Sequence, residues 1–183
     1  MRIVGFDLET SDLKGLMGRI FCCSFMPIVD GVATTPYTFR IDQKEFKGRS
    51  AIDDSRLAAA IRDELEEYNL IVGWNSKLFD APFLNARLAK AGERHLRPQF
   101  HLDLMYYMRG SSMRVGSSKL VSAQKFFKLG TQKTEIEWDH WALTAAGDTV
   151  SLDEVVEHCE ADVRVLAEAY WKLLPFVSNL CRA

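Results

Sequence analysis

The chain has 183 residues, of which 48% are hydrophobic and 26% charged, and its formal net charge at pH 7 is −2. This length favours one domain over residues 1–183, and the composition is that of an ordinary water-soluble protein. No apolar run approaches a membrane span and no secretory leader is present, so we expect a cytoplasmic protein without a membrane partner. Four cysteines without a CxxC pair favour reduced thiols and argue against zinc.

The first part of the sequence predicts a sheet. Residues 2–9, 19–29 and 32–41 are rich in β-branched and aromatic residues and are therefore expected to be strands. Asp30-Gly31 is a strong hairpin-turn signal between the second and the third of them. We therefore expect three strands in meander order.

Helices and strands are then predicted to alternate. Apolar residues at steps of three and four predict a helix at 55–68, and a short apolar run predicts a buried strand at 70–74. A second helix is expected at 81–92, where Gly92 would end it. A meander followed by this alternation indicates an α/β protein with a mixed sheet.

The last part of the sequence predicts one long helix. Residues 100–105 fit either a strand or the start of a helix, and short helices and loops are expected at 110–150. Ser151 and Glu154 have the spacing of a capping box, and Pro175 would stop the helix that they begin. Steps of three and four along it select the residues that would face a core: Leu152, Val155, Cys159, Asp162, Leu166, Ala169 and Leu173.

Two acidic stretches lie where predicted elements begin or end. In FDLET, Asp7 and Glu9 are two residues apart on a strand, so both carboxylates point to one face, roughly 6.6 Å apart along the strand. In NSKLFD, Asp80 stands before a helix and fits an N-cap with Pro82 in the first turn. The same position also fits a ligand site, because such sites gather at the ends of strands in α/β proteins.

The third stretch, HCEAD, places a carboxylate in the apolar stripe of the long helix. A buried carboxylate is costly unless it is paired or binds a metal. Asp162 would therefore lie at the edge of the stripe, pair with a basic side chain, or coordinate a cation. His158, one turn earlier, shares its face, although a half-buried helix histidine is the simpler interpretation of that residue alone.

Residues 104–134 form a basic segment that contains no Asp or Glu. Such a segment is suited to following a phosphate backbone, and a solvated helix face is an equally good explanation. Its positive charges are Arg109, Arg114, Lys119, Lys125, Lys128 and Lys133.

Taken in order, DxE, NxxxFD and HCEAD resemble the motifs of the DEDD, or DnaQ-like, 3′–5′ exonuclease superfamily over nearly the whole chain. The resemblance implies a ribonuclease-H-like α/β fold, with a mixed central sheet flanked by helices in a single domain. It makes Asp7, Glu9, Asp80 and Asp162 the metal-binding carboxylates for two divalent cations, Mg²⁺ or Mn²⁺, about 3.5–4 Å apart. In that arrangement Asp7 bridges both ions, Glu9 and Asp162 hold the ion of the nucleophile, and Asp80 supports the second.

His158 departs from the pattern of this superfamily. One branch has a tyrosine four residues before the last Asp, and another has a histidine five residues before it. This chain has histidine at the tyrosine spacing, and its likeness is closer to the tyrosine branch, which includes exonuclease domains of B-family polymerases. His158 is the candidate general base or water-orienting group, so activity should fall as the pH drops below about 6.5.

The resemblance implies a metal-dependent 3′–5′ exonuclease that hydrolyses phosphodiester bonds at the 3′ end of single-stranded nucleic acid, with DNA favoured. The alternatives are an exoribonuclease of the ribonuclease D or oligoribonuclease type, or a non-catalytic module that binds nucleic acid or a polymerase. Proofreading would require a separate partner, a polymerase or another replication or repair protein. The residues beside the motifs that would contact substrate are Leu8, Thr10, Asn75 and Phe79.

Overall fold

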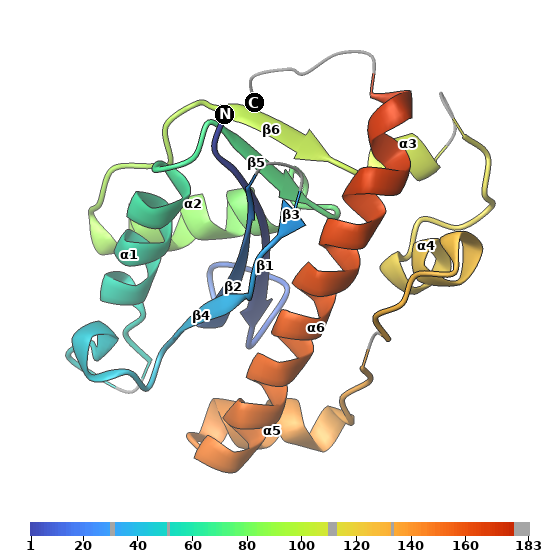
Figure 1. Cartoon of the computed structure of the whole chain (residues 1–183). Helices are drawn as coiled ribbons and strands as arrows, with labels where there is room; N and C mark the ends of the chain where they lie inside the picture. The colour runs from blue at the N-terminus through green and yellow to red at the C-terminus, as the bar shows by residue number, and fades with distance from the viewer. Residues whose placement is uncertain (30–31, 51, 110–112, 133, 178–183) are drawn as a thin grey trace.

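The structure is a computed structural model that describes residues 1–29, 32–50, 52–109, 113–132 and 134–177 (Figure 1). One sheet has the strand order β3-β2-β1-β5-β6, and β4 also pairs with β2. Strand β1 is antiparallel to β2 and parallel to β5, which is parallel to β6, so the predicted mixed sheet is confirmed. The strands are β1 (Ile3–Thr10), β2 (Ile20–Val29), β3 (Val32–Ala33), β4 (Tyr37–Arg40), β5 (Leu70–Gly73) and β6 (Phe100–Asp103).

Helices cover both faces of the sheet. Helices α1 and α2 pack on one face, and the long helix α6 crosses the other with α4 beside it (Figure 1). None of the helices in the described ranges combines the length and the apolar character that a membrane span requires. The helices are α1 (Ser55–Leu65), α2 (Asp80–Ala91), α3 (Met105–Met108), α4 (Leu120–Phe127), α5 (Trp138–Ala146) and α6 (Thr149–Leu173), with 3₁₀ turns η1 (Lys44–Phe46) and η2 (Leu174–Phe176).

The predicted third strand is wrong in one respect, because it is two short strands. Strand β3 ends at Ala33 and β4 begins at Tyr37, and Pro36 between them has no N–H to donate to a ladder. Before this break, the backbone N–H of Thr34 still donates to the Pro27 carbonyl of β2. The predicted turn at Asp30-Gly31 lies outside the described residues, but β2 and β3 on either side of it do pair antiparallel.

The predicted capping box at the start of α6 is also wrong. The helix begins at Thr149, and the side chain of Asp148 caps it by accepting a hydrogen bond of 2.7 Å from the backbone N–H of Ser151. Gly147 ends α5 in the left-handed conformation (φ 99°), which allows the chain to turn directly into this cap. Ser151 is consequently buried inside the first turn. All seven residues of the predicted stripe are buried.

Candidate functional site

Strand β1 presents its acidic residues to helix α6. Leu8 belongs to the core on the α1–α2 side, whereas a Cβ on Gly5 would lie 3.4 Å from Leu166 of α6. Because side chains alternate along a strand, Asp7 and Glu9 face α6 together with Gly5. Ligand atoms of Asp7, Glu9 and Cys159 lie within 4.8 Å of one another. Alternation therefore brings the two carboxylates of FDLET to one place, beside a thiol that the sequence analysis did not select.

Asp80 reaches the same end of the sheet from helix α2. Phe79 occupies the N-cap position, so the interpretation of Asp80 as a helix cap is wrong. The pairing of β1 with β5 ends at Gly5 and Val72, which leaves the later part of β1 without a strand on that side. The backbone N–H of Leu8 donates to Asp80 Oδ1 instead, over 3.1 Å. Asp80 thus takes the place of a strand partner just where β1 carries Asp7.

The turn before α2 is held by Asp103, which the sequence analysis missed. Asp103 is the last residue of β6, and its carboxylate accepts hydrogen bonds from the backbone N–H groups of Asn75 (2.9 Å), Lys77 (3.0 Å) and Met105 (3.1 Å). Asn75 adopts a left-handed conformation (φ 63°), which asparagine tolerates better than most residues. The sequence does contain a signal for Asp103, because FHLD places an Asp at the carboxyl end of a strand, where ligand sites gather in α/β proteins.

Helix α6 supplies three residues to this region, two adjacent ones and a third about one turn later. Cys159 Sγ lies 3.4 Å from the backbone oxygen of Asp7 and 3.6 Å from its Oδ2. One residue earlier, His158 has its Nδ1 2.7 Å from the hydroxyl of Thr134 and its Nε2 3.8 Å from Glu9 Oε1. Asp162 is 7% exposed and lies one turn further along the same face.

Among the described residues, no basic side chain pairs with the carboxyl group of Asp80. Burial raises its pKa well above the usual range, and the charge of nearby Asp7 raises this pKa further. The N–H of Leu8 acts in the opposite direction but does not offset burial. A divalent cation between the carboxylates would favour their ionised forms, and oxygen donors suit Mg²⁺ or Mn²⁺. The donor set at this end of the sheet therefore fits such an ion.

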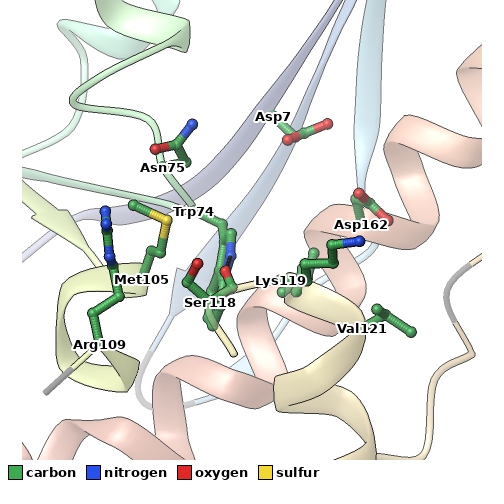
Figure 2. A pocket seen from close by; sticks show the side chains of 10 residues that line it. Asp7, Trp74, Asn75, Met105, Arg109, Ser118, Lys119, Val121 and Asp162 are labelled. Atoms are coloured by element: carbon green, nitrogen blue, oxygen red, sulfur yellow. Dashed lines mark hydrogen bonds between the residues drawn. The ribbon is translucent and has the colours of Figure 1, made fainter. Parts of the chain in front are cut away.

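A cavity of about 550 Å³ opens beside these groups, and we call it the carboxylate cavity (Figure 2). Of the predicted site residues, Asp7, Asn75 and Asp162 line it. Its wall also includes the basic side chains of Arg109 and Lys119, and Lys119 points toward Asp162 in Figure 2. Its full lining is Asp7, Trp74, Asn75, Met105, Arg109, Ser118, Lys119, Leu120, Val121 and Asp162.

The other predicted substrate contacts do not line this cavity. The side chain of Leu8 is buried on the opposite face of the sheet, and Phe79 packs against the core there, with its ring centroid 5.7 Å from that of Phe83. The Thr10 hydroxyl donates to the Asp12 carbonyl over 2.9 Å. Alternation along β1 explains the result for Leu8, because the residue next to Asp7 in the strand points to the other face of the sheet.

The basic segment divides into two parts in the structure. Arg109 and Lys119 reach the carboxylate cavity, while Lys125 lies on an exposed part of α4. Lys133 lies outside the described residues. Trp74 fixes the segment against the sheet, because its Nε1–H donates to the Ser118 carbonyl over 2.8 Å. Charge alone predicted a basic segment, but the path of the chain decides which charges meet the carboxylates.

Comparisons with known proteins agree with this architecture. The family model of the RNase H superfamily matches residues 4–174. The structure of the family B DNA polymerase from the hyperthermophilic archaeon Pyrobaculum calidifontis is similar, with a TM-score of 0.72 and 20% sequence identity. The match covers 96% of this chain and 25% of the polymerase chain, so this chain spans about a quarter of that protein's length, and at this identity the likeness concerns the fold. No protein with a curated description matches the sequence.

Proposed function

Since the chain belongs to the RNase H superfamily, we propose that it is a metal-dependent nuclease that removes nucleotides from the 3′ end of a single strand. Many members of this superfamily are nucleases, and those typically use divalent metals. The observation that carries the proposal is the meeting of acidic side chains from three elements at one end of the sheet. The ligand atoms of Asp7 lie close to those of Glu9 and Cys159, and the charge of Asp7 raises the pKa of the buried Asp80.

Asp7, Glu9, Asp80 and Asp162 would hold the divalent ions. When bound, such ions lower the pKa of water and neutralise charge on the phosphate and on the leaving oxygen. The chain's own contribution is to bring the carboxylates together on β1, α2 and α6. The surrounding fold fixes them, since Leu8 holds Asp80 and Asp103 holds the preceding turn.

His158 would orient the attacking water or accept its proton. Its ring is positioned by Thr134 through Nδ1, and Nε2 faces Glu9. If Nδ1–H donates to the Thr134 hydroxyl, Nε2 carries the lone pair that a general base requires. The shift of this histidine relative to the histidine branch is thus compatible with a role in proton transfer.

A nucleic-acid substrate is supported by the carboxylate cavity, which combines acidic residues with Arg109 and Lys119. The cations would bind the phosphates of a strand whose terminal phosphodiester lies at the carboxylates. The structural likeness to a DNA polymerase supports the same class of substrate and favours DNA. An exoribonuclease is the second candidate, because the same cavity lining suits either sugar.

The proposal is tested with single strands of DNA and RNA labelled at the 5′ end. Each is incubated with Mg²⁺, with Mn²⁺ and with EDTA. We expect a ladder that shortens from the 3′ end with either metal, no products with EDTA, and faster digestion of DNA. Internal cuts would contradict the 3′ polarity, and products formed in EDTA would contradict the role of the carboxylates. Faster digestion of RNA would favour the second candidate.

A further inference from the structure

A second cavity of about 460 Å³ adjoins the carboxylate cavity, and Arg109 and Ser118 line both. We call it the arginine cavity. Its lining is Met108, Arg109, Arg114, Gly116, Ser117 and Ser118, which includes two arginines and no acidic residue. The two cavities together thus lead from the carboxylates, past a shared arginine, to a site whose charge is entirely positive.

The arginines are available to a ligand. Arg109 and Arg114 are both exposed, and no carboxylate in the described part of the chain pairs with either. An isolated antiparallel bridge joins Arg109 to Arg114, so the backbone holds the two positions next to each other. Two unpaired guanidinium groups at one cavity are a site for an anion, because each presents planar donors that match phosphate oxygens.

The Ser117 and Ser118 part of the arginine cavity is anchored to the rest of the site. Trp74, which lines the carboxylate cavity, donates to the Ser118 carbonyl, and the Ser122 hydroxyl donates to Ser117 Oγ over 2.8 Å. Gly116, which precedes these anchors in the chain, adopts a left-handed conformation (φ 84°) that glycine accepts without strain. The distance between the arginine cavity and the carboxylates is therefore set by the fold and not by a free loop end.

We propose that the arginine cavity binds a backbone phosphate of the substrate strand on the side away from its 3′ end, so that the preferred substrate is an oligonucleotide and not a dinucleotide. This inference rests on the proposed function and extends it. In this arrangement the terminal phosphodiester of the substrate strand lies at Asp7 and Asp162. The strand then passes Arg109, and a phosphate nearer its 5′ end binds Arg114. Contacts of this kind hold the strand but carry no information about its bases.

Strand length is the first readout. In the wild-type enzyme kcat/KM should rise as the substrate lengthens from a dinucleotide to an octanucleotide, and Arg114→Ala should lose most of this gain. Lys125→Ala is the matched control, because Lys125 belongs to the same basic segment and lines neither cavity. Arg114→Lys, which keeps the charge without the fork, should recover part of the gain. An unchanged length dependence in Arg114→Ala would overturn the inference.

Binding without hydrolysis is the second readout. Anisotropy of a fluorescent octanucleotide in EDTA should show about tenfold weaker binding by Arg114→Ala, for oligo-dT and oligo-dA alike. The slope of log K against log salt should fall by about 0.7, the value for one phosphate contact on a single strand. Arg114-dependent binding without any hydrolysis would leave this inference standing and remove the proposed nuclease activity. Hydrolysis together with binding that is unchanged in Arg114→Ala would overturn this inference and leave the proposed nuclease activity standing.

Discussion

Helix α2 connects two buried aspartates that the fold treats differently. Asp54 is 2% exposed, and its carboxylate accepts hydrogen bonds from Arg87 of α2 (2.7 and 2.9 Å) and from the backbone N–H of Ile20 (2.8 Å). Asp80, at the other end of the same helix, is 4% exposed, and no basic side chain in the described residues pairs with it. The contrast separates a carboxylate that an arginine neutralises from one that, under the proposed function, would help to hold a cation from solution.

The largest expected effect is at the acidic end of the sheet. Asp7→Asn should lower metal-dependent hydrolysis by more than about 100-fold, because even groups one step removed from a metal cost up to that much. Initial rates on a labelled strand measure this, and the midpoint of thermal unfolding in EDTA should stay close to that of the wild type. A variant that keeps its rate would show that Asp7 holds no catalytic ion.

A change in the Asp54–Arg87 pair should lower the stability of the folded protein. Asp54→Ala leaves the guanidinium of Arg87 buried without its partner, so the free energy of unfolding should fall by about 3–5 kcal/mol. Urea unfolding followed by circular dichroism measures the loss. The double variant Asp54→Leu with Arg87→Leu removes both charges and should lose less than the single change. Equal losses would mean that packing, and not the stranded charge, dominates at this position.

Divalent ions should stabilise the protein through the acidic end of the sheet. At a concentration of Mn²⁺ one hundred times its dissociation constant, the free energy of unfolding should rise by about 2.7 kcal/mol. Thermal unfolding with and without Mn²⁺ measures this rise. The Asp54→Ala variant should keep the rise and Asp7→Asn should lose it, so a rise that survives Asp7→Asn would place the ion elsewhere.

The smallest effect concerns Asp80 itself in the absence of metal. Because the folded-state pKa of Asp80 is raised above that of the unfolded chain, the folded state retains the proton longer, and stability should fall as the pH rises through this window. Asp80→Asn keeps an acceptor for Leu8 and removes the charge, so in EDTA at pH 7 it should stabilise the protein. Urea unfolding across pH in EDTA measures both. A pH dependence that persists in Asp80→Asn would assign it to another group.

The regular elements were predictable because their patterns are local. The apolar periods of α1 and α6 and the alternation of β1 identified these elements, and alternation alone put Asp7 and Glu9 on one face. The helix starts were predicted less well, since Asp148 competes with Ser151, and Phe79 takes the cap position that Asp80 was expected to fill.

The features that the sequence did not predict depend on contacts between distant segments. Asp103 acts on a turn that lies more than twenty residues earlier in the chain, and Cys159 meets Asp7 across two elements. The basic segment was recognised by its composition, but the grouping of Arg109 with Arg114 depends on a backbone bridge that no local pattern specifies. Side chains that serve a site through tertiary contacts carry no periodic signal of their own.

The early end of the β1–β5 ladder limits how this protein can be redesigned. The ladder stops at Gly5 and Val72, and the next part of β1 donates from Leu8 to Asp80. An engineer who extended β5 to give a more regular sheet would gain backbone pairing and displace Asp80 from its anchor. Sheet regularity and placement of this acid therefore compete for the same N–H group, and a stabilised variant should be sought at other edges.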